Sequence, residues 1–284
     1  MGFLVDPFLG NEFMIRALAA GVLVSIACAI VGTFIVLRGL AFIGDALAHG
    51  VLPGIAVAFL LGVPGMVGAA VGALVMIAGI NLITRRSRLS SDTAIGLLFV
   101  AMLALGVVIV SRSATFTGDL VGILFGQILG TSVEGLVLQA VAVLVVAAVA
   151  VICARPFQLL SFDPELADVA GFPARRYHAV MLVLVALTVI VSFQTVGTLL
   201  VFAMLLAPAS AGVLLAHRID AMMAWGAAIG SVSTYAGLLL SYHLDLAAGA
   251  SIALVATGLF FVVFAAANVR ARVSRPARVH GATQ

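Results

Sequence analysis

The sequence predicts an all-α polytopic membrane protein, and three observations support this fold class. Hydrophobic residues make up 64% of the 284 residues and charged residues only 9%, whereas a typical soluble domain is roughly 25% charged. The mean hydropathy is +1.31. The apolar residues form long runs, and no polar stretch between them is long enough for a separate soluble domain. We therefore expect one transmembrane domain over residues 1–284.

Nine apolar runs are candidate spans of a bilayer, whose hydrocarbon core takes about 20 helical residues. They cover residues 14–37, 43–61, 65–84, 93–111, 133–153, 179–193, 197–216, 220–242 and 246–267. The first run is long enough to span, so a cleavable signal peptide is not expected. Between the sixth and seventh runs lies only SFQTVGT (192–198), which fits a tight external turn or a break within one helix. Eight spans is therefore an alternative to nine.

The basic residues predict the orientation of the chain in the membrane. All fourteen are arginines, and they lie in short connections rather than on one face, which disfavours nucleic-acid binding. If the Arg-rich tail (268–284) is cytoplasmic and nine spans are counted backwards, only Arg16 and Arg112 fall outside. The cytoplasmic side of a membrane protein carries the excess of arginine. We therefore expect a cytoplasmic C-terminus and an external N-terminus.

The longest polar interval on the predicted inner side covers residues 154–178, here called the inner segment. Within it, DPELADVAG (163–171) predicts a short amphipathic helix, because Asp163 suits an N-cap, Pro164 a first turn and Gly171 a stop. Leu166, Val169 and Ala170 would share one face of this helix. Composition alone leaves two interpretations open, a solvated loop and a surface that docks on a cytoplasmic partner.

Asp45 and His49 are two of the few ionisable residues expected within or at the edge of the spans. An ionisable group in a bilayer costs several kcal/mol unless it is paired or hydrated, which makes each one a functional candidate. Residues four apart on a helix share a face. A carboxylate and an imidazole suit Mn²⁺ or Zn²⁺. An internal hydrogen bond that holds helices together is the alternative, and two ligands alone cannot complete a coordination shell.

His243 and Asp245 are expected at the outer end of two consecutive spans. An interfacial turn with a helix-capping aspartate is the favoured interpretation. An external gate, or a docking point for a donor protein, is the alternative.

The cysteines, the methionines and the absence of enzyme motifs indicate that the chain has no thiol, soft-metal or hydrolytic site. Cys28 and Cys153 lie in apolar segments and are expected to be small core residues rather than a disulfide or metal site. The methionines Met204, Met222 and Met223 are expected to pack rather than to bind a soft metal. No motif of a metalloprotease, serine hydrolase or nucleotide-binding loop is present. We therefore expect neither an enzyme nor a chain that itself hydrolyses ATP.

Three segments together resemble a known family of membrane proteins. FIVLRGLAFIGDALAHGVLPGIAVAF (34–59), VGTLLVFAMLLAPASAG (196–212) and SYHLDLAAGASI (241–252) are similar to permease subunits of bacterial zinc- and manganese-importing ATP-binding-cassette transporters. Members of the family usually read G-D-A-L-S-H-A-V-L-P-G in the first segment. This chain differs there only at Ala48 and Gly50, both small residues. It also has His243 where the family usually has an aromatic residue, whereas Asp245 matches.

The resemblance implies a type II importer fold and a set of partners. Two permeases would surround a central path, with two cytoplasmic ATPases below them and an external metal-binding protein that delivers the ion. Asp45 and His49 would coordinate the ion in the path. The inner segment would contain the helix that couples the permease to the ATPase. Its residues that match the family pattern D-x-E-x-A-x-x-x-G are Asp163, Glu165, Ala167 and Gly171.

The expected function is therefore the permease of an ATP-driven Zn²⁺ or Mn²⁺ importer in the bacterial cytoplasmic (inner) membrane, with no permanently bound cofactor. A permease for siderophores, haem or cobalamin is an alternative, but it would need a wide path and no fixed acid–imidazole pair. An ion-coupled carrier is a second alternative, which should contain more ionisable residues in its spans. A third is a structural membrane subunit without a transport path.

Overall fold

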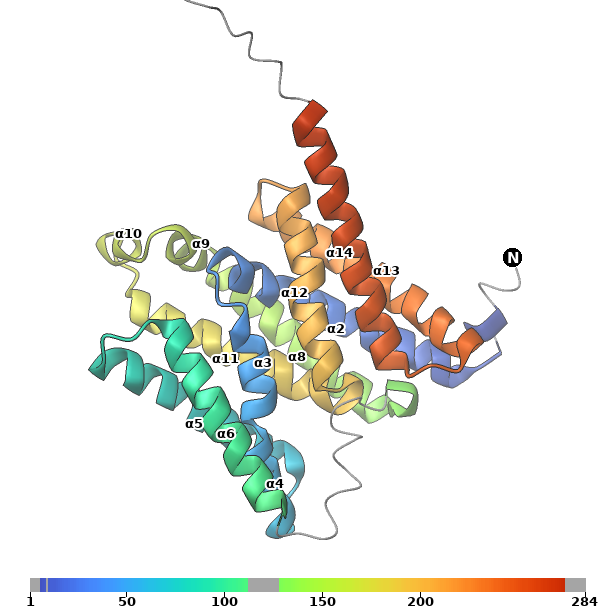
Figure 1. The fold of residues 1–284 in the computed structure, drawn as a ribbon, viewed down its shortest axis with the longest axis horizontal. Coiled ribbons are helices and arrows are strands. Elements are labelled where there is room, and N and C mark those ends of the chain that lie inside the picture. Colours follow the sequence, from blue (N-terminus) through green and yellow to red (C-terminus); the bar gives the residue numbers. More distant parts are fainter. Residues whose placement is uncertain (1–5, 9, 112–127, 274–284) are drawn as a thin grey trace, which may run out of the picture.

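The computed structural model describes residues 6–8, 10–111 and 128–273. Within these ranges the secondary structure is helical and contains no strand. The helices are α2 (Glu12–Leu37), α3 (Phe42–Gly50), α4 (Leu52–Leu60), α5 (Gly65–Arg86), α6 (Ser91–Ser111), the 3₁₀ turn η1 (Ile128–Gly130), α8 (Val133–Ile152), α9 (Ala154–Phe162), α10 (Pro164–Val169), α11 (Ala174–Val196), α12 (Thr198–Leu215), α13 (Ile219–Leu244) and α14 (Ala248–Val273). Figure 1 shows their arrangement.

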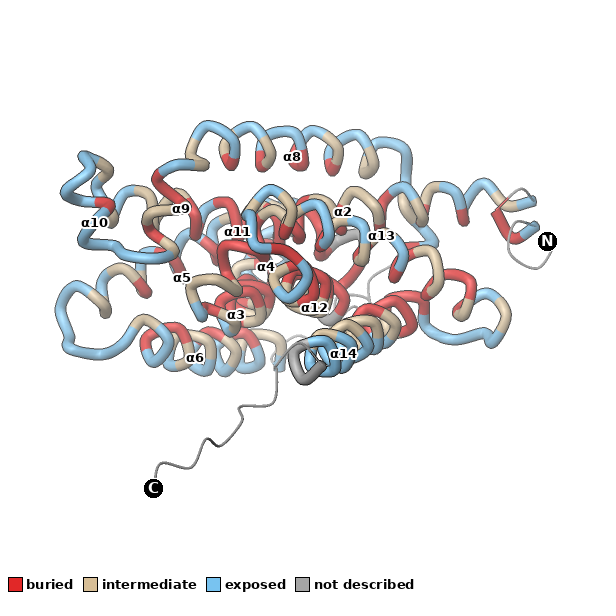
Figure 2. Tube along the Cα trace, turned by 90° about the horizontal axis from the view of Figure 1, so that it is seen from above, coloured by how far each residue is buried: buried red, intermediate tan, exposed pale blue. Residues whose placement is uncertain are grey.

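The helices confirm the predicted class of an all-α polytopic membrane protein. In the described part of the chain, eight helices are long and apolar enough to span a bilayer, with α3 and α4 counted as one, and α12 adds a shorter apolar stretch, Leu200–Leu215. Many large apolar side chains lie on the outside, as on α6, where Leu97, Val100 and Val107 are all more than half exposed. Figure 2 shows exposed residues along the outer sides of α6, α8 and α14. Such a surface is stable in lipid but not in water.

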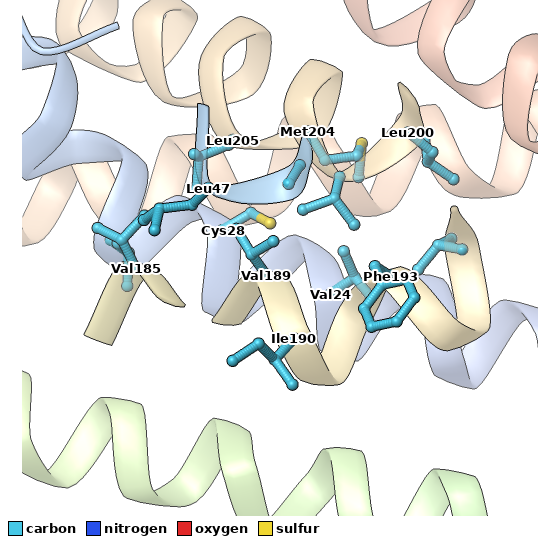
Figure 3. Close-up of a cluster of buried hydrophobic side chains, with 14 of the residues drawn as sticks. Val24, Cys28, Leu47, Val185, Val189, Ile190, Phe193, Leu200, Met204 and Leu205 are labelled. Carbon is cyan, nitrogen blue, oxygen red and sulfur yellow. The ribbon is translucent and has the colours of Figure 1, made fainter. Parts of the chain in front are cut away.

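α2 lies at the centre of the bundle and packs against α8, α12 and α13. Figure 3 shows the core on this helix, where Val24 and Cys28 lie among side chains of α11 and α12. Leu47 of α3 and Met204 of α12 belong to the same cluster and are at most 1% exposed. Both cysteines are free thiols and Cys28 is buried, as predicted for a small core residue.

The segment SFQTVGT (192–198) contains the junction between two separate helices, α11 and α12. α11 extends to Val196 and α12 begins at Thr198, so a single residue separates them. That residue, Gly197, has φ +79°, a conformation that glycine adopts without steric cost. Beyond it, α12 packs against α2, α13 and α14 rather than continuing α11. The predicted run 179–193 was also too short, because α11 begins at Ala174.

The span predicted over residues 43–61 is divided into two helices. α3 ends at Gly50 and α4 starts at Leu52, with Val51 between them. Pro53 has no N–H to bond the carbonyl of His49 four residues earlier, and this break in the hydrogen-bond ladder ends α3. The division therefore follows directly after the imidazole of the candidate site.

The inner segment contains one helix more than the sequence predicted. α9 buries Phe157 and Leu160, three residues apart on one face. Pro156 lies in its first turn, where a proline needs no hydrogen-bond donor, so it is compatible with this helix. The predicted tail 268–284 also starts as helix, since α14 continues to Val273. Arg112 and residues 274–284 lie outside the described residues.

Candidate functional site

One face of α3 is directed away from the core and contains the predicted acid and imidazole. Phe42, Asp45 and His49 are the partly or fully exposed residues that share this face, while Ile43 and Leu47 are buried on the other side. The spacing of three and four residues is that of one helix face. Leu47 lies in the buried cluster of Figure 3, whereas Asp45 and His49 are partly exposed.

The two side chains are in contact with each other. His49 Nε2 lies 3.4 Å from Asp45 Oδ1, and the side chains are 23% and 31% exposed. Asp45 is in the first turn of α3, where the helix dipole favours a negative charge. The carboxylate and the imidazole are therefore held together by one helix, as their spacing predicted.

The contact does not join two helices, since both residues belong to α3. The ring of His49 packs edge-on against Phe99 of α6, with ring centroids 5.9 Å apart. His49 Nδ1 is buried and has no hydrogen-bond partner among the described residues. A buried polar atom without a partner costs about 1–3 kcal/mol, and such atoms in native proteins commonly have a functional reason.

The pair has the geometry to share one metal ion. Ligand atoms about 2.1 Å from an ion and 3.4 Å from each other subtend an angle of about 108° at that ion. Such an angle suits tetrahedral coordination and is within reach of a distorted octahedral shell. In the described part of the chain, no group of three or more His, Cys, Asp and Glu side chains is placed to hold a metal. The described part of one chain therefore provides two such ligands, a partial shell.

An apolar groove of about 530 Å³ lies between α12 and α14. Phe202 lines this groove and also lies against Gly44 of α3, on the helix that holds the pair. The groove is further lined by Leu206, Leu254 and Phe261. Helix α3 is thus connected to the groove through the contact of Phe202 with Gly44.

The helix predicted from DPELADVAG is present as α10. The Asp163 carboxylate accepts hydrogen bonds from the backbone N–H groups of Glu165 and Leu166, at 2.9 and 3.2 Å, which is the geometry of an N-cap. Ala167 is 1% exposed and anchors α10. Gly171 follows the helix with φ +85°, as expected of a residue that ends it.

The outer surface of the inner segment is apolar. Leu166 is 51% exposed and Val169 is 86% exposed on α10, and Phe162 at the end of α9 is 76% exposed. Beside them is a hollow of about 640 Å³, which Arg155 and Phe172 help to line. Figure 1 shows α9 and α10 together at one end of the molecule. An exposed apolar group of this kind beside a cation is suited to docking on another protein.

His243 and Asp245 lie at the opposite end of the molecule. Asp245 is the C-cap of α13 and adopts the left-handed conformation, φ +50° and ψ +41°, which aspartate tolerates better than most residues. Its neighbour His243 packs edge-on against Tyr242. A hollow of about 610 Å³ lies here, with Asp245 and Met14 among its lining residues. The structure thus has the predicted interfacial turn, and a gate or docking role stays a prediction.

The structure brings Arg38 together with His178, the last residue of the inner segment. Arg38, treated only as a sign of orientation, donates a hydrogen bond to Nδ1 of His178 at 2.9 Å. The sequence signal that could have identified Arg38 is its place immediately after a long apolar run and before the motif that contains Asp45.

Comparison with known proteins gives matches over most of the chain. Residues 10–267 match the family described as the ABC 3 transport family. The chain is 37% identical, over 262 residues, to the manganese transport system membrane protein MntC of Halalkalibacterium halodurans, covering 92% of this chain and 90% of that protein. It is 38% identical, over 271 residues, to a probable iron transport system membrane protein of Haemophilus influenzae, covering 95% and 99%.

The fold is similar to a solved structure as well. A chain of PsaBC from Streptococcus pneumoniae, solved in complex with Fab, superposes with a TM-score of 0.82 at 34% identity, covering 92% of this chain and 94% of that chain. These matches confirm the resemblance that the three motif segments predicted.

Proposed function

The chain belongs to the ABC 3 transport family, and on that premise we propose that it is the permease of an importer that moves a divalent metal ion across the bacterial cytoplasmic membrane. The observation that carries the proposal is the Asp45–His49 pair on α3, whose Oδ1 and Nε2 atoms lie 3.4 Å apart on partly exposed side chains. The ion is the cargo. The two side chains replace part of its water shell and hold it weakly enough to release it.

Mn²⁺ is the proposed cargo, with Fe²⁺ and Zn²⁺ as competing ions. Carboxylate oxygens are ligands that suit Mn²⁺, and imidazole nitrogens are ligands that suit Fe²⁺ and Zn²⁺. Ligand chemistry alone therefore does not separate the three. Two kinds of relative, named for manganese transport and for iron transport, favour Mn²⁺ and Fe²⁺ over Zn²⁺ for this chain.

Two copies of the chain form the path in this proposal. The described residues of one copy supply two side-chain ligands, whereas Mn²⁺ prefers about six donor atoms. The pair lies on a partly exposed face of α3, and Phe202, which lines the apolar groove between α12 and α14, packs against Gly44 of the same helix. A second copy packed against this surface would bring a second Asp45–His49 pair to the same ion and would cover apolar surface. Water molecules or backbone carbonyls would complete the shell.

The two ends of the molecule have different roles in the proposal. α10 docks on a cytoplasmic ATP-binding-cassette ATPase through Leu166 and Val169, and Asp163, Glu165, Ala167 and Gly171 shape that helix and its ends. The turn with His243 and Asp245 faces outward and receives the metal-binding protein. This orientation places the C-terminus in the cytoplasm, in agreement with the arginine distribution.

The alternatives predict different features from those observed. A permease for siderophores, haem or cobalamin needs a wide path, and an acid–imidazole pair within it would have no function. An ion-coupled carrier would not need the exposed apolar surface of α10. A structural subunit would give no reason for an acid–imidazole pair on a partly exposed helix face.

Metal uptake by cells that express the complete importer tests the proposal. We expect Asp45→Asn and His49→Ala to reduce ⁵⁴Mn uptake at least tenfold at equal membrane abundance, because even groups that only orient a metal ligand affect affinity by about 10–100-fold. The matched controls are Asp220→Asn and His217→Ala, an acid and a histidine that are exposed at the start of α13 and just before it. We expect both controls to keep normal uptake.

Parallel uptake of ⁵⁵Fe and ⁶⁵Zn determines the cargo. If both site variants carry all three metals at the wild-type rate, the proposed site is wrong. If the wild-type importer carries only a chelated metal or a cofactor, the alternative class of permease is correct.

A further inference from the structure

The cytoplasmic end of α2 is joined to the start of α11 by a hydrogen bond between half-buried groups. Arg38 is the C-cap of α2, and its guanidinium donates to Nδ1 of His178 at 2.9 Å. The same guanidinium nitrogen lies 3.5 Å from Sδ of Met181 on α11. An arginine cannot accept a hydrogen bond, so His178 accepts with Nδ1 and is neutral. The contact is thus a directed bond between two specific side chains, 140 residues apart in the sequence.

A row of aromatic rings joins the same helix end to the inner segment. Phe34 of α2 packs edge-on against Phe157 of α9, with ring centroids 5.2 Å apart. Phe157 is followed by Tyr177 of α11 at 6.5 Å, and Tyr177 by Phe172 after α10 at 5.8 Å. Phe157 is only 1% exposed. The end of α2, the helix α9 and the turn after α10 therefore share one packed contact.

From the same end of α2 the chain passes directly to the candidate metal site. Only residues 38–41 separate α2 from α3. The backbone hydrogen bonds that hold this connection include one from Leu40 N–H to the Ile35 carbonyl and one from Ile43 N–H to the Leu40 carbonyl, both 3.1 Å. Asp45 lies in the first turn of α3. A displacement of the end of α2 must therefore move the helix that presents Asp45 and His49.

We propose that the Arg38–His178 bond, supported by the aromatic row, is the link through which movement of α10 reaches the metal pair on α3. Arg38 and His178 are positioning residues that do not touch the ion. When the ATPase moves α10, Phe172, Tyr177 and His178 move with it. Arg38 passes this displacement to the connection before α3. The inference rests on the proposed function, since it assumes that α10 docks on the ATPase.

Two single substitutions each remove the hydrogen bond between Arg38 and His178, one by replacing the donor and one by replacing the acceptor. Arg38→Met eliminates the donor and keeps an unbranched side chain that fills the space, and His178→Leu eliminates the acceptor. The matched control is Arg86→Met, which removes an exposed arginine at the end of α5. The importer, assembled with its ATPase and metal-binding protein, is reconstituted in proteoliposomes. Mn²⁺ uptake and ATP hydrolysis are then measured in the same sample.

We expect each single variant to keep ATPase co-purification and ATP hydrolysis within twofold of the wild type. The number of Mn²⁺ ions moved per ATP should fall at least fivefold, and Arg86→Met should leave it unchanged. The double variant should be no worse than either single variant, because both remove the same interaction. A residue that only stabilised the fold would lower abundance and hydrolysis together with uptake.

Three results would overturn the link while the proposed function stands. The first is an unchanged number of Mn²⁺ ions moved per ATP in either single variant. The second is a double variant in which this number falls by the product of the two single reductions. The third is a variant that no longer co-purifies with the ATPase. A wild-type importer that hydrolyses ATP but moves no Mn²⁺, Fe²⁺ or Zn²⁺ would overturn the proposed function itself, and the link with it.

Discussion

Individual glycines determine how closely α4 and α5 approach each other. A Cβ atom placed on Gly68 would collide with the carbonyl oxygen of Gly54, and a Cβ atom placed on Gly54 would collide with that of Gly68. Both obstacles are backbone atoms, which cannot rotate away as a side chain can. Small residues at such crossings allow membrane helices to pack at short distance. The two glycines therefore place α4, which continues the α3 span, directly against α5.

The smallest possible side chain at this crossing should already destabilise the protein. We expect Gly68→Ala to cost about 1–3 kcal/mol through overpacking, which lowers the melting temperature by roughly 2–10 °C for a chain of this size. Gly96→Ala is the control, because a Cβ atom there meets nothing within 4 Å and alanine favours a helix. Thermal unfolding in detergent measures both. Equal melting temperatures for the two variants would show that the crossing is not close-packed.

At the scale of residues, the sequence predicted the pair but not its surroundings. Helical spacing placed Asp45 and His49 on one face, and the structure confirms that they touch. The unpartnered Nδ1 of His49 could not be predicted, because it depends on what α6 and the other helices place around the ring. The hydrogen bond between Arg38 and His178 could not be predicted from the sequence either, because it joins residues 140 positions apart.

Among the helices, sequence patterns predicted ends well where local chemistry sets them. Asp163, Pro164 and Gly171 identified α10, because a cap, a first-turn proline and a left-handed glycine act within a few residues. α9 was missed, since burial of Phe157 against Phe34 stabilises it and tertiary contacts are not visible in sequence. The division of the second span between α3 and α4 was missed for a similar reason. Pro53 is compatible with a kink or a complete break, and packing determines which occurs.

The exposed face of α10 should be required for docking and dispensable for folding. We expect Leu166→Ser with Val169→Ser to reduce ATPase co-purification about tenfold, because loss of two buried apolar side chains costs more than 1.4 kcal/mol at an interface. Both side chains are more than half exposed, so the melting temperature of the permease should stay the same. Leu89→Ser, which removes a 45% exposed side chain between α5 and α6, is the control. Full co-purification of the double variant would contradict the docking surface.

At the scale of the whole molecule, α2 connects two different regions, because each of its ends contacts one of them. Its 26 residues extend about 39 Å at 1.5 Å per residue, enough to cross the bilayer. Met14, near its start, lines the hollow that contains Asp245. Arg38, after its end, contacts the helix that follows α10. This arrangement fits a protein that receives a cargo on one side and is driven from the other.

Two ligands from one chain can be explained only by considering the whole assembled importer. Asp45 and His49 are partly exposed in one chain, and the described part of that chain contains no third acidic, histidine or cysteine ligand beside them. In an assembled importer with two copies, the same surfaces would face each other across the path. The central claim is therefore that the passing ion is bound by the α3 pair within that assembly.

Electron spin echo spectroscopy of Mn²⁺ bound to the assembled importer tests this claim most directly. A bound imidazole gives nitrogen modulation of the Mn²⁺ signal, because its ligand atom is ¹⁴N. We predict this modulation in the wild-type importer and in the control His217→Ala, and its loss in His49→Ala at equal protein concentration. Modulation that persists unchanged in His49→Ala, or a membrane-bound Mn²⁺ site with no nitrogen modulation in the wild type, would contradict the account.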